Sequence, residues 1–277
     1  MMMKIVLGVE YFGGDFNGFQ RQKNENENLR TVQTNLENAI SKIAKQAIKI
    51  FPCGRTDAKV HAANQIVHFE VAKQKFQHFP YSAWIKGVNA FLPKNISIKW
   101  CKYILSNDLA TEFHARFSAI KRRYRYILLN QNERPGLLAG RCGWYHFDLD
   151  VAKMNQAAKF LLGEQDFSCF RAAGCQAKTP IKTMFQANVY EVKNFFNAPK
   201  TIFFDLEATG FLLHMVRNIV GTLVYIGDPR KALEITYMKE LLKQKNRVFA
   251  PPTFSGDGLY FFGASYPTHF EIPELIF

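Results

Sequence analysis

The sequence predicts an α+β fold made of two halves of similar length that share a sheet. Segments of alternating apolar residues, typical of strands, are interspersed with segments of helical periodicity throughout the 277 residues. This succession runs through residues 1–105 and again through residues 106–277, which we expect to be the two domains. No glycine-rich fingerprint follows the first strand, so a parallel, doubly wound sheet is disfavoured.

In the first half, alternating apolar residues predict strands at residues 5–9, 47–51, 67–71 and 96–105. Apolar residues three and four positions apart predict helices at residues 32–47 and 81–88. Within the first helix, Thr34 and Glu37 have the spacing of a capping box. His68 lies in the third strand and is expected to be part of a sheet face, because its spacing from His61 is poor for metal binding.

In the second half, the same patterns predict strands at residues 122–129, 185–192, 202–208 and 259–263. A helix is expected to begin after Asp150, as its N-cap, and to end at Gly163, as its C-cap. Two further helices are predicted at residues 211–226, which are strongly apolar, and at residues 237–245.

The composition excludes several classes of protein. With 48% hydrophobic and 21% charged residues the chain is too apolar for disorder, and no run is long enough to span a membrane. The five cysteines form no Cys-x-x-Cys pair, so the sequence predicts neither a zinc knuckle nor a disulfide framework, and a reduced cytoplasm is expected. The net charge of +13 indicates an anionic partner, either a nucleic acid or a membrane surface.

Residues 53–62 place Gly, Arg, Thr, Asp and His in one short segment between two apolar strands. Loops held by rigid strands commonly present reactive groups, which makes Asp57 and Arg55 candidate site residues. The alternative is an ordinary turn in which Asp57 caps a backbone amide and Arg55 is solvated.

Residues 121–126 contain four basic side chains with interleaved tyrosines. On a strand, Arg123 and Arg125 would share one face, while Arg122, Tyr124 and Tyr126 would share the other. One face could meet phosphates while the opposite aromatic residues stack on a base or fill a core. A solvated basic edge strand explains the pattern nearly as well.

Arg217 lies inside the apolar segment 211–221. A buried arginine needs a carboxylate or a phosphate as a partner, because an unpaired buried charge is costly. Asp57 is the natural candidate partner. Alternatively, Arg217 lies at the edge of the apolar stripe and its side chain extends to water.

Taken together, these segments resemble the bacterial tRNA pseudouridine synthase A family, which isomerises uridines in the anticodon arm of tRNA. The similarity covers nearly the whole chain in the expected order. It is carried by the segments Gly18–Gln22, Gly54–Ala62, Phe113–Phe117, Arg122–Tyr126, His214–Asn218 and Gly258–Tyr260.

The resemblance implies that Asp57 is the catalytic aspartate and that Tyr124 packs on the target uracil. It further implies that Arg217 pairs with the aspartate, that Arg55 helps to hold the flipped nucleotide, and that Leu259 lines the pocket. Two departures from the family pattern are visible. Lys59 replaces a glycine that usually follows Asp-Ala, and residues 250–259 form a longer segment than usual.

The implied fold has two similar α/β halves that share a central, mostly antiparallel sheet with helices packed on it. The implied protein is a cytoplasmic homodimer that needs neither metal nor cofactor and isomerises uridine at tRNA positions 38–40. Its partner is therefore expected to be tRNA and not a membrane.

The sequence leaves some alternatives open. The carboxylate could attack C1′ as a nucleophile or remove a proton from C2′ as a base. A tRNA-binding protein or chaperone without turnover, and a synthase with a different target site, are also compatible with these patterns. A hydrolase that uses Asp57 with water is disfavoured, because no second carboxylate accompanies it.

Overall fold

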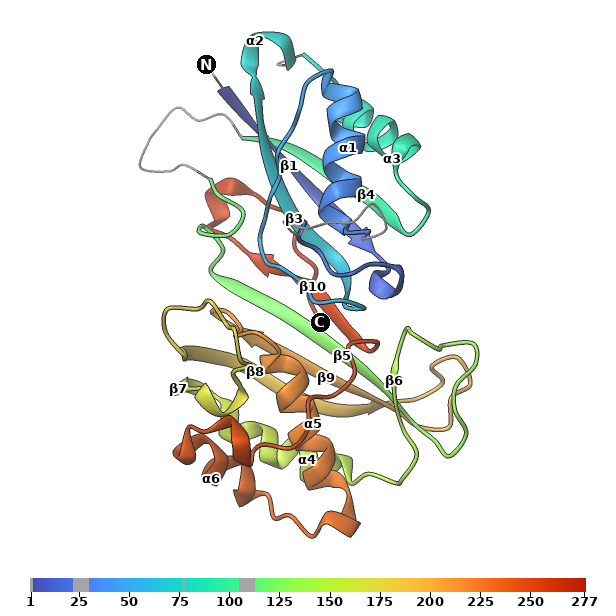
Figure 1. Ribbon diagram of the computed structural model, residues 1–277, viewed down its shortest axis with the longest axis vertical. Coiled ribbons are helices and arrows are strands. Elements are labelled where there is room, and N and C mark those ends of the chain that lie inside the picture. Colours follow the sequence, from blue (N-terminus) through green and yellow to red (C-terminus); the bar gives the residue numbers. More distant parts are fainter. Residues whose placement is uncertain (1, 22–29, 77, 105–112) are drawn as a thin grey trace. The chain divides into compact units, whose positions relative to one another are not determined.

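The computed structural model describes residues 2–21, 30–76, 78–104 and 113–277, and the chain divides into two compact units (Figure 1). Unit 1 comprises Met1–Ile120 and Phe261–Phe277, and unit 2 comprises Lys121–Tyr260. These units differ from the expected halves, because the last seventeen residues pack with unit 1. The boundary expected between residues 105 and 106 lies outside the described residues.

The strands of unit 1 form an antiparallel sheet in the order β4–β1–β3, and the short β2 pairs with β3. These strands are β1 (Met2–Tyr11), β2 (Phe51–Pro52), β3 (His61–Ala72) and β4 (Ile96–Ile104). The helices of this unit are α1 (Val32–Ala44), α2 (Lys73–Phe76) and α3 (Val88–Phe91), the last preceded by a π-helical turn at Ala83–Gly87. Figure 1 shows α1 and α3 side by side over one face of this sheet.

Helix α1 begins at the predicted residue, but the predicted capping box is wrong. Thr31 is the N-cap, and its hydroxyl accepts a hydrogen bond from the Thr34 N–H at 3.3 Å. Thr34 is therefore already inside the helix, and the Glu37 carboxylate makes other contacts, described below.

Helices cover one face of the unit 1 sheet, and a loop covers the other. On the helix side, the Phe69 ring packs against the Trp84 ring with centroids 5.3 Å apart. On the other side, the Lys4 ammonium donates to the Phe113 carbonyl at 2.7 Å, and His68 Nδ1 accepts from the Ala115 N–H at 3.2 Å. His68 is 2% exposed, so the expectation of a histidine in a sheet face is confirmed.

The C-terminal residues are joined to unit 1 by polar and aromatic contacts. Lys102 forms an ion pair with Glu271 at 2.6 Å, and the Asn64 amide donates to the Pro273 carbonyl at 3.3 Å. The Phe113 ring lies 5.2 Å from the Phe270 ring. These contacts explain why residues 261–277 belong to this unit rather than to the half that precedes them in sequence.

The strands of unit 2 form an antiparallel sheet in the order β5–β9–β8–β7, with the short β6 parallel to β5. They are β5 (Lys121–Asn130), β6 (Gly143–Tyr145), β7 (Gly163–Asp166), β8 (Ile181–Val192) and β9 (Thr201–Ala208). The helices are α4 (Val151–Ala158), α5 (Met215–Gly227) and α6 (Thr236–Gln244). Strand β10 (Leu259–Ser265) begins in unit 2 and ends in unit 1.

Asp150 caps α4 as predicted, because its carboxylate accepts from the Lys153 N–H at 2.8 Å. Gly163 is not the C-cap of this helix, since a 3₁₀ turn follows α4 and Gly163 begins β7. The α+β class is confirmed, and the strand pairs named above are antiparallel except for β5 with β6.

Helix α5 begins at Met215, four residues later than predicted. His214 has a left-handed backbone with φ 58°, which cannot continue a helix. The preceding Leu213 binds another loop instead: its N–H donates to Cys175 Sγ at 3.4 Å, and its carbonyl accepts from the Ala172 N–H at 3.1 Å. The predicted helix was therefore too long at its start. Residues 211–214 are apolar enough to continue the pattern, but Leu213 contacts another loop and is not part of the helix.

The burial of His68 predicts a measurable pH dependence of stability. Burial, with smaller contributions from His114 and Lys4, lowers the pKa of His68 from 6.5 to about 3. Below pH 6.5 the unfolded chain therefore takes up a proton that the folded chain cannot, so the free energy of unfolding decreases as the pH falls. We expect a loss of roughly 2 kcal/mol between pH 7 and pH 5 from this residue, measured by urea denaturation.

His68→Gln should reduce the difference in unfolding free energy between the two pH values, whatever it does to stability at pH 7. The matched control is His78→Gln at an exposed histidine, which should keep the pH difference of the unmodified protein. An unchanged difference in His68→Gln would show that His68 is not the group responsible.

Candidate active site

Asp57 lies in the loop between β2 and β3, and both arms of this loop are fixed by hydrogen bonds. We call residues 53–60 the Asp57 loop. The Cys53 N–H donates to the Ile66 carbonyl at 2.7 Å. The buried Gln65 amide binds Gly54 twice, donating to its carbonyl at 2.8 Å and accepting from its N–H at 3.4 Å. The start of the loop is therefore attached to β3.

The residue before Asp57 is the most tightly held part of the loop. Thr56 is buried, its hydroxyl lies 2.7 Å from the Tyr11 hydroxyl, and its carbonyl accepts from the Phe19 N–H at 3.0 Å. Burial raises the pKa of Tyr11 to about 12, so this phenol stays protonated at neutral pH. After Asp57, the Val60 N–H donates to the Asp57 carbonyl at 3.2 Å and closes a turn.

The Asp57 loop also rests directly on the chain around Gly18. Gly18 has φ +96°, and a Cβ there would lie 3.0 Å from the Thr56 carbonyl oxygen and 3.3 Å from the Ala58 nitrogen. Only glycine combines this backbone conformation with such a close approach. Sequence reasoning matched Gly18 to the family pattern, but it did not identify this residue, Tyr11 or Gln65 as supports of Asp57.

The turn that follows Asp57 is exposed and contains a residue with a left-handed backbone. Lys59 has φ 68°, the left-handed conformation that glycine adopts without strain. Lysine in this conformation costs about 1 kcal/mol. Asp57 itself is half-buried and Arg55 is exposed, so the loop presents both side chains at its surface.

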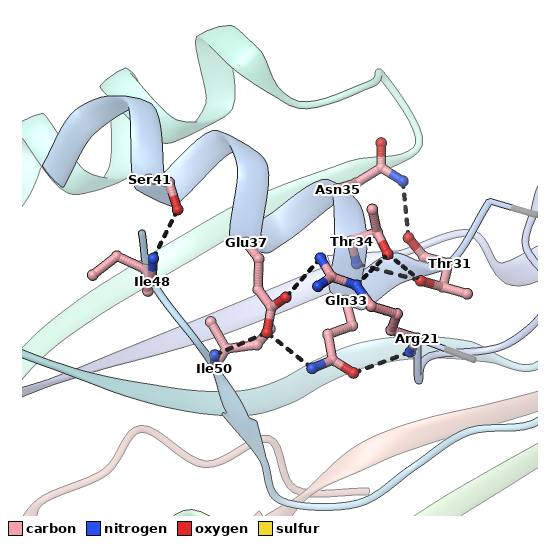
Figure 2. Close-up of polar contacts among 9 residues, drawn as sticks. All are labelled: Arg21, Thr31, Gln33, Thr34, Asn35, Glu37, Ser41, Ile48 and Ile50. Atoms are coloured by element: carbon pink, nitrogen blue, oxygen red, sulfur yellow. Dashed lines mark hydrogen bonds and ion pairs between the residues drawn. The ribbon is translucent and has the colours of Figure 1, made fainter. Parts of the chain in front are cut away.

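A buried carboxylate connects three segments that support this loop (Figure 2). Glu37 Oε2 forms an ion pair with Arg21 Nη2 at 3.0 Å, while Glu37 Oε1 accepts from the Ile50 N–H at 3.2 Å and from Gln33 Nε2 at 2.9 Å. Arg21 follows the Gly18 segment, and Ile50 leads into β2. The Glu37 side chain therefore contacts both the segment that follows Gly18 and the segment that leads into the Asp57 loop. Gln22, the last residue of the matched segment, lies outside the described residues.

In unit 2, Tyr124 lies on β5 with its ring against Phe211. The two ring centroids are 5.0 Å apart and the planes are nearly perpendicular, at 81°. Tyr124 is half-buried, whereas Tyr126 on the same face is fully buried and donates to the Ser255 carbonyl at 3.0 Å. The predicted alternation thus leaves one tyrosine accessible and places the other in the core.

On the opposite face of β5, Arg123 and Arg125 bind carboxylates of the same unit. The possible role of this face in binding phosphates is therefore not supported. Arg123 Nε binds Glu207 Oε2 at 2.6 Å, and the Lys121 ammonium binds Glu207 Oε1 at 2.8 Å. Arg125 forms a two-pronged pair with Asp205, at 2.7 and 2.8 Å. The strand register places each arginine opposite its carboxylate, so these positive charges stabilise the sheet.

The pKa of Glu207 agrees with its pairing with Lys121 and Arg123. Burial would raise the pKa of Glu207, but hydrogen bonds from Lys121 and Arg123 outweigh that effect and hold the pKa below its ordinary value. Glu207 therefore carries a full negative charge at neutral pH and neutralises its basic neighbours.

Arg217 lies in the first turn of α5 and is half-buried. Its Nε donates to the Phe254 carbonyl at 2.8 Å, and its own carbonyl accepts from the Phe254 N–H at 3.3 Å. The neighbouring Asn218 accepts from the Thr253 hydroxyl at 2.7 Å. The long segment before Leu259 is therefore fixed to α5. Arg217 and Asp57 belong to different units, and their pairing stays a prediction.

Leu259 begins β10 and is 4% exposed. The adjacent Gly258 carbonyl accepts from the Ile127 N–H at 2.9 Å, so this residue lies beside β5 within unit 2. Its expected role in lining the pocket stays a prediction. Within the described ranges, no group of three His, Cys, Asp or Glu side chains has the arrangement to hold a metal ion.

Similarity to known proteins extends over almost the whole chain. Residues 8–118 and 157–267 match the family model described as tRNA pseudouridine synthase. The tRNA pseudouridine synthase A of Dechloromonas aromatica (strain RCB) is 46% identical over 272 residues, covering 98% of this chain and 96% of that protein. The protein of the same name from Haemophilus influenzae is 47% identical, covering 98% of this chain and 93% of its own length.

The chain belongs to the tRNA pseudouridine synthase family. It is accordingly an isomerase that acts on uridine in tRNA. The matched segments contain Asp57, Arg217 and Leu259, whereas Tyr124 lies between them. In the described parts of the chain, no helix is long and apolar enough to cross a membrane.

The Glu37 contacts predict a stability test for the support of the Asp57 loop. Glu37→Ala removes a buried acceptor and leaves the Arg21 charge and the Ile50 N–H without this partner. We expect a loss of about 2–3 kcal/mol in the free energy of unfolding, measured by urea denaturation.

The matched control is Glu10→Ala. Glu10 pairs with Lys99 at 3.3 Å, but both side chains are about half exposed, at 52% and 50%. An exposed pair of this kind contributes at most about 0.5–1 kcal/mol. Equal losses in the two variants would show that the Glu37 network contributes no more than a surface pair.

Proposed function

We propose that this tRNA pseudouridine synthase modifies uridines at positions 38–40 of the anticodon stem-loop and that Asp57 is its catalytic carboxylate. The relatives over 98% of the chain bear the name tRNA pseudouridine synthase A, which supports the choice of target. The observation that carries the assignment of Asp57 is the construction of its loop. Backbone and buried side chains fix the residues on either side, while the carboxylate itself is half-buried.

The reaction suits a fixed carboxylate. The N1–C1′ bond of uridine breaks, the uracil turns, and C5 forms a new bond to C1′, after which C5 loses its proton and N1 takes one up. Because the product is an isomer of the substrate, the overall reaction requires no external electron donor or acceptor. Asp57 acts either as a nucleophile at C1′ or as a base at C2′, and rigid positioning of its oxygens favours both routes.

The remaining site residues are proposed to prepare the nucleotide. The target base must leave its stack at a cost of a few kcal/mol, and stacking on an aromatic ring recovers part of that cost. Tyr124 provides such a ring, which Phe211 holds from one side. Arg217 is proposed to pair with Asp57, Arg55 to help hold the flipped nucleotide, and Leu259 to line the pocket.

We further propose that the protein works as a homodimer in the cytoplasm and without a cofactor. The resemblance to the family supports the dimer, and the absence of any Cys-x-x-Cys pair from the sequence is compatible with a reducing compartment. The basic surplus of the chain supplies general affinity for tRNA, which should weaken steeply with salt.

The role of Asp57 predicts that Asp57→Asn loses turnover but keeps tRNA binding. The amide has nearly the same shape as the carboxylate but is neither a nucleophile nor a base, so we expect a rate reduction of at least about 10³-fold. Tritium release from tRNA labelled at C5 of uridine measures turnover, and filter binding measures affinity.

The control is Asp148→Asn, which changes an aspartate whose side chain is 87% exposed. It should retain turnover. Retained turnover in Asp57→Asn would refute the catalytic assignment, and absence of turnover in the unmodified protein would favour a tRNA-binding role. Mapping of the modified uridines in the same reactions distinguishes positions 38–40 from another target.

The stacking role of Tyr124 predicts different effects for two substitutions. Tyr124→Phe keeps the ring and should retain most of the activity, whereas Tyr124→Ala removes the stacking surface. Because stacking contributes about 1–3 kcal/mol per base, we expect Tyr124→Ala to reduce kcat/KM by roughly 5- to 150-fold. Equal losses in both variants would instead assign a chemical role to the hydroxyl.

A further inference from the structure

The hydroxyl of Tyr11 lies in the core of unit 1, beside the Asp57 loop. Tyr11 is 3% exposed, and its oxygen lies 2.7 Å from the Thr56 hydroxyl, so these two buried groups share one hydrogen bond. Gln65 is also buried; it is a further hydrogen-bond partner of the Tyr11 hydroxyl and binds both backbone groups of Gly54. One phenol therefore contacts the side chain next to Asp57 and the side chain that holds the start of the loop.

An irregularity in the sheet sets the position of Tyr11. Val9 of β1 is paired with Gln65 of β3. Two residues later, Tyr11 is paired with Ala62, which lies three residues before Gln65. The extra residue of β3 forms a β-bulge, a feature that redirects side chains and is common beside active sites. Because side chains alternate along a strand and directly paired residues share a face, Val9, Tyr11 and Gln65 all lie on one side of the sheet.

The backbone on both sides of Asp57 is fixed by hydrogen bonds. The Thr56 carbonyl accepts from the Phe19 N–H at 3.0 Å, and this carbonyl lies in the same peptide plane as the Asp57 nitrogen. On the other side, the Asp57 carbonyl accepts from the Val60 N–H at 3.2 Å. The two peptide planes determine the direction of the Cα–Cβ bond of Asp57. A shift of Thr56 would therefore move the point from which the carboxylate extends.

A pair of hydroxyls at this place specifies geometry more than it adds stability. Thr56 is buried, whereas Arg55 is exposed and Asp57 is half-buried, so the Thr56 side chain points into the unit. Two apolar side chains of the same shape would fill the same space, and replacing both partners of a buried hydrogen bond in this way costs little stability. A hydrogen bond, unlike an apolar contact, requires a particular distance and angle. The bond to Tyr11 therefore fixes Thr56 relative to β1.

We propose that Tyr11 is a positioning residue of the reaction, whose hydroxyl holds Thr56 and thereby keeps the backbone of Asp57 in the place that the reaction requires. This inference rests on the proposed catalytic role of Asp57. Tyr11 is buried and acts through Thr56, so loss of its hydroxyl should slow the chemical step and leave the affinity for tRNA unchanged.

The first test compares Tyr11→Phe with the unmodified protein in single-turnover assays, with the protein in saturating excess over an unmodified tRNA transcript. Because a displacement of about 1 Å costs up to about 100-fold in rate, we expect the rate constant of pseudouridine formation to fall by about 10- to 100-fold. The Kd for the transcript, measured by filter binding, should change less than about twofold. Thr56→Val removes the other hydroxyl and should give the same result, whereas Thr56→Ser keeps it and should recover most of the rate.

The double variant Tyr11→Phe/Thr56→Val separates positioning from stability. Each single variant leaves a buried hydroxyl without this partner and should lower the Tm by about 3–8 °C. The double variant replaces both hydroxyls by apolar groups and should regain at least about half of that loss. Its rate constant should nevertheless stay at least about tenfold below that of the unmodified protein. Recovery of the rate in the double variant would overturn the proposal, because the hydroxyl pair would then act only through stability.

The matched control is Tyr266→Phe, at a second buried tyrosine of unit 1. Its hydroxyl donates to the carbonyl of Ala115, which is not part of the Asp57 loop, at 2.6 Å. This variant should lower the Tm by a similar amount and keep the rate constant within about twofold. All rates are measured at a temperature at which circular dichroism shows each variant to be folded. Equal rate losses in Tyr266→Phe and Tyr11→Phe would refute a specific role of Tyr11.

Failure of this proposal and failure of the proposed function give different results. Asp57→Asn is measured in the same single-turnover assay. If Asp57→Asn retains turnover, the catalytic assignment of Asp57 and the positioning role that rests on it are both refuted. If Asp57→Asn is inactive while the folded double variant reacts at the rate of the unmodified protein, only the role of Tyr11 is refuted.

Discussion

The position of Thr56 is the constraint on which the Asp57 loop depends. Its hydroxyl and carbonyl are bound by Tyr11 and by the backbone of Phe19, which come from a strand and a loop distant in sequence. A residue next to such a fixed point has little backbone freedom, so the entropy of orienting the backbone of Asp57 is lost during folding. The close approach of Gly18 makes this packing possible, because any side chain there would meet the loop backbone.

A second constraint on the Asp57 loop comes from Glu37, a buried carboxylate of α1 that lies outside the loop. Glu37 binds Arg21 on one side and the backbone of Ile50 on the other. Arg21 continues the segment that holds Thr56, and Ile50 precedes the strand from which the Asp57 loop emerges. A single carboxylate therefore determines the spacing between the loop and its support, which neither hydrophobic packing nor strand pairing specifies alone.

The sequence alone predicted the features that depend on local periodicity and capping. The paired strands β8 and β9, the N-cap Asp150 and the start of α1 all follow from patterns within a few residues. The late start of α5 did not follow, because the left-handed His214 and the bonds of Leu213 to another loop are tertiary effects. The supports of the Asp57 loop were missed for the same reason, since Tyr11 contacts Thr56 and Gln65 contacts Gly54 only in the folded chain.

The net positive charge was the least specific sequence signal for function. The structure shows that several of the basic side chains bind carboxylates of the same chain. A pattern of alternating arginines cannot show which face of a strand will meet carboxylates. On β5, Asp205 and Glu207 neutralise the residues of one face, while Arg122 and Tyr124 project from the other. Each ion pair neutralises one positive and one negative side chain, so pairing does not change the net charge of +13. The same net charge is then carried by fewer unneutralised side chains. Internal pairing therefore raises the proportion of basic groups among the remaining charges, and on β5 it engages the arginines of one face with carboxylates of the neighbouring strand.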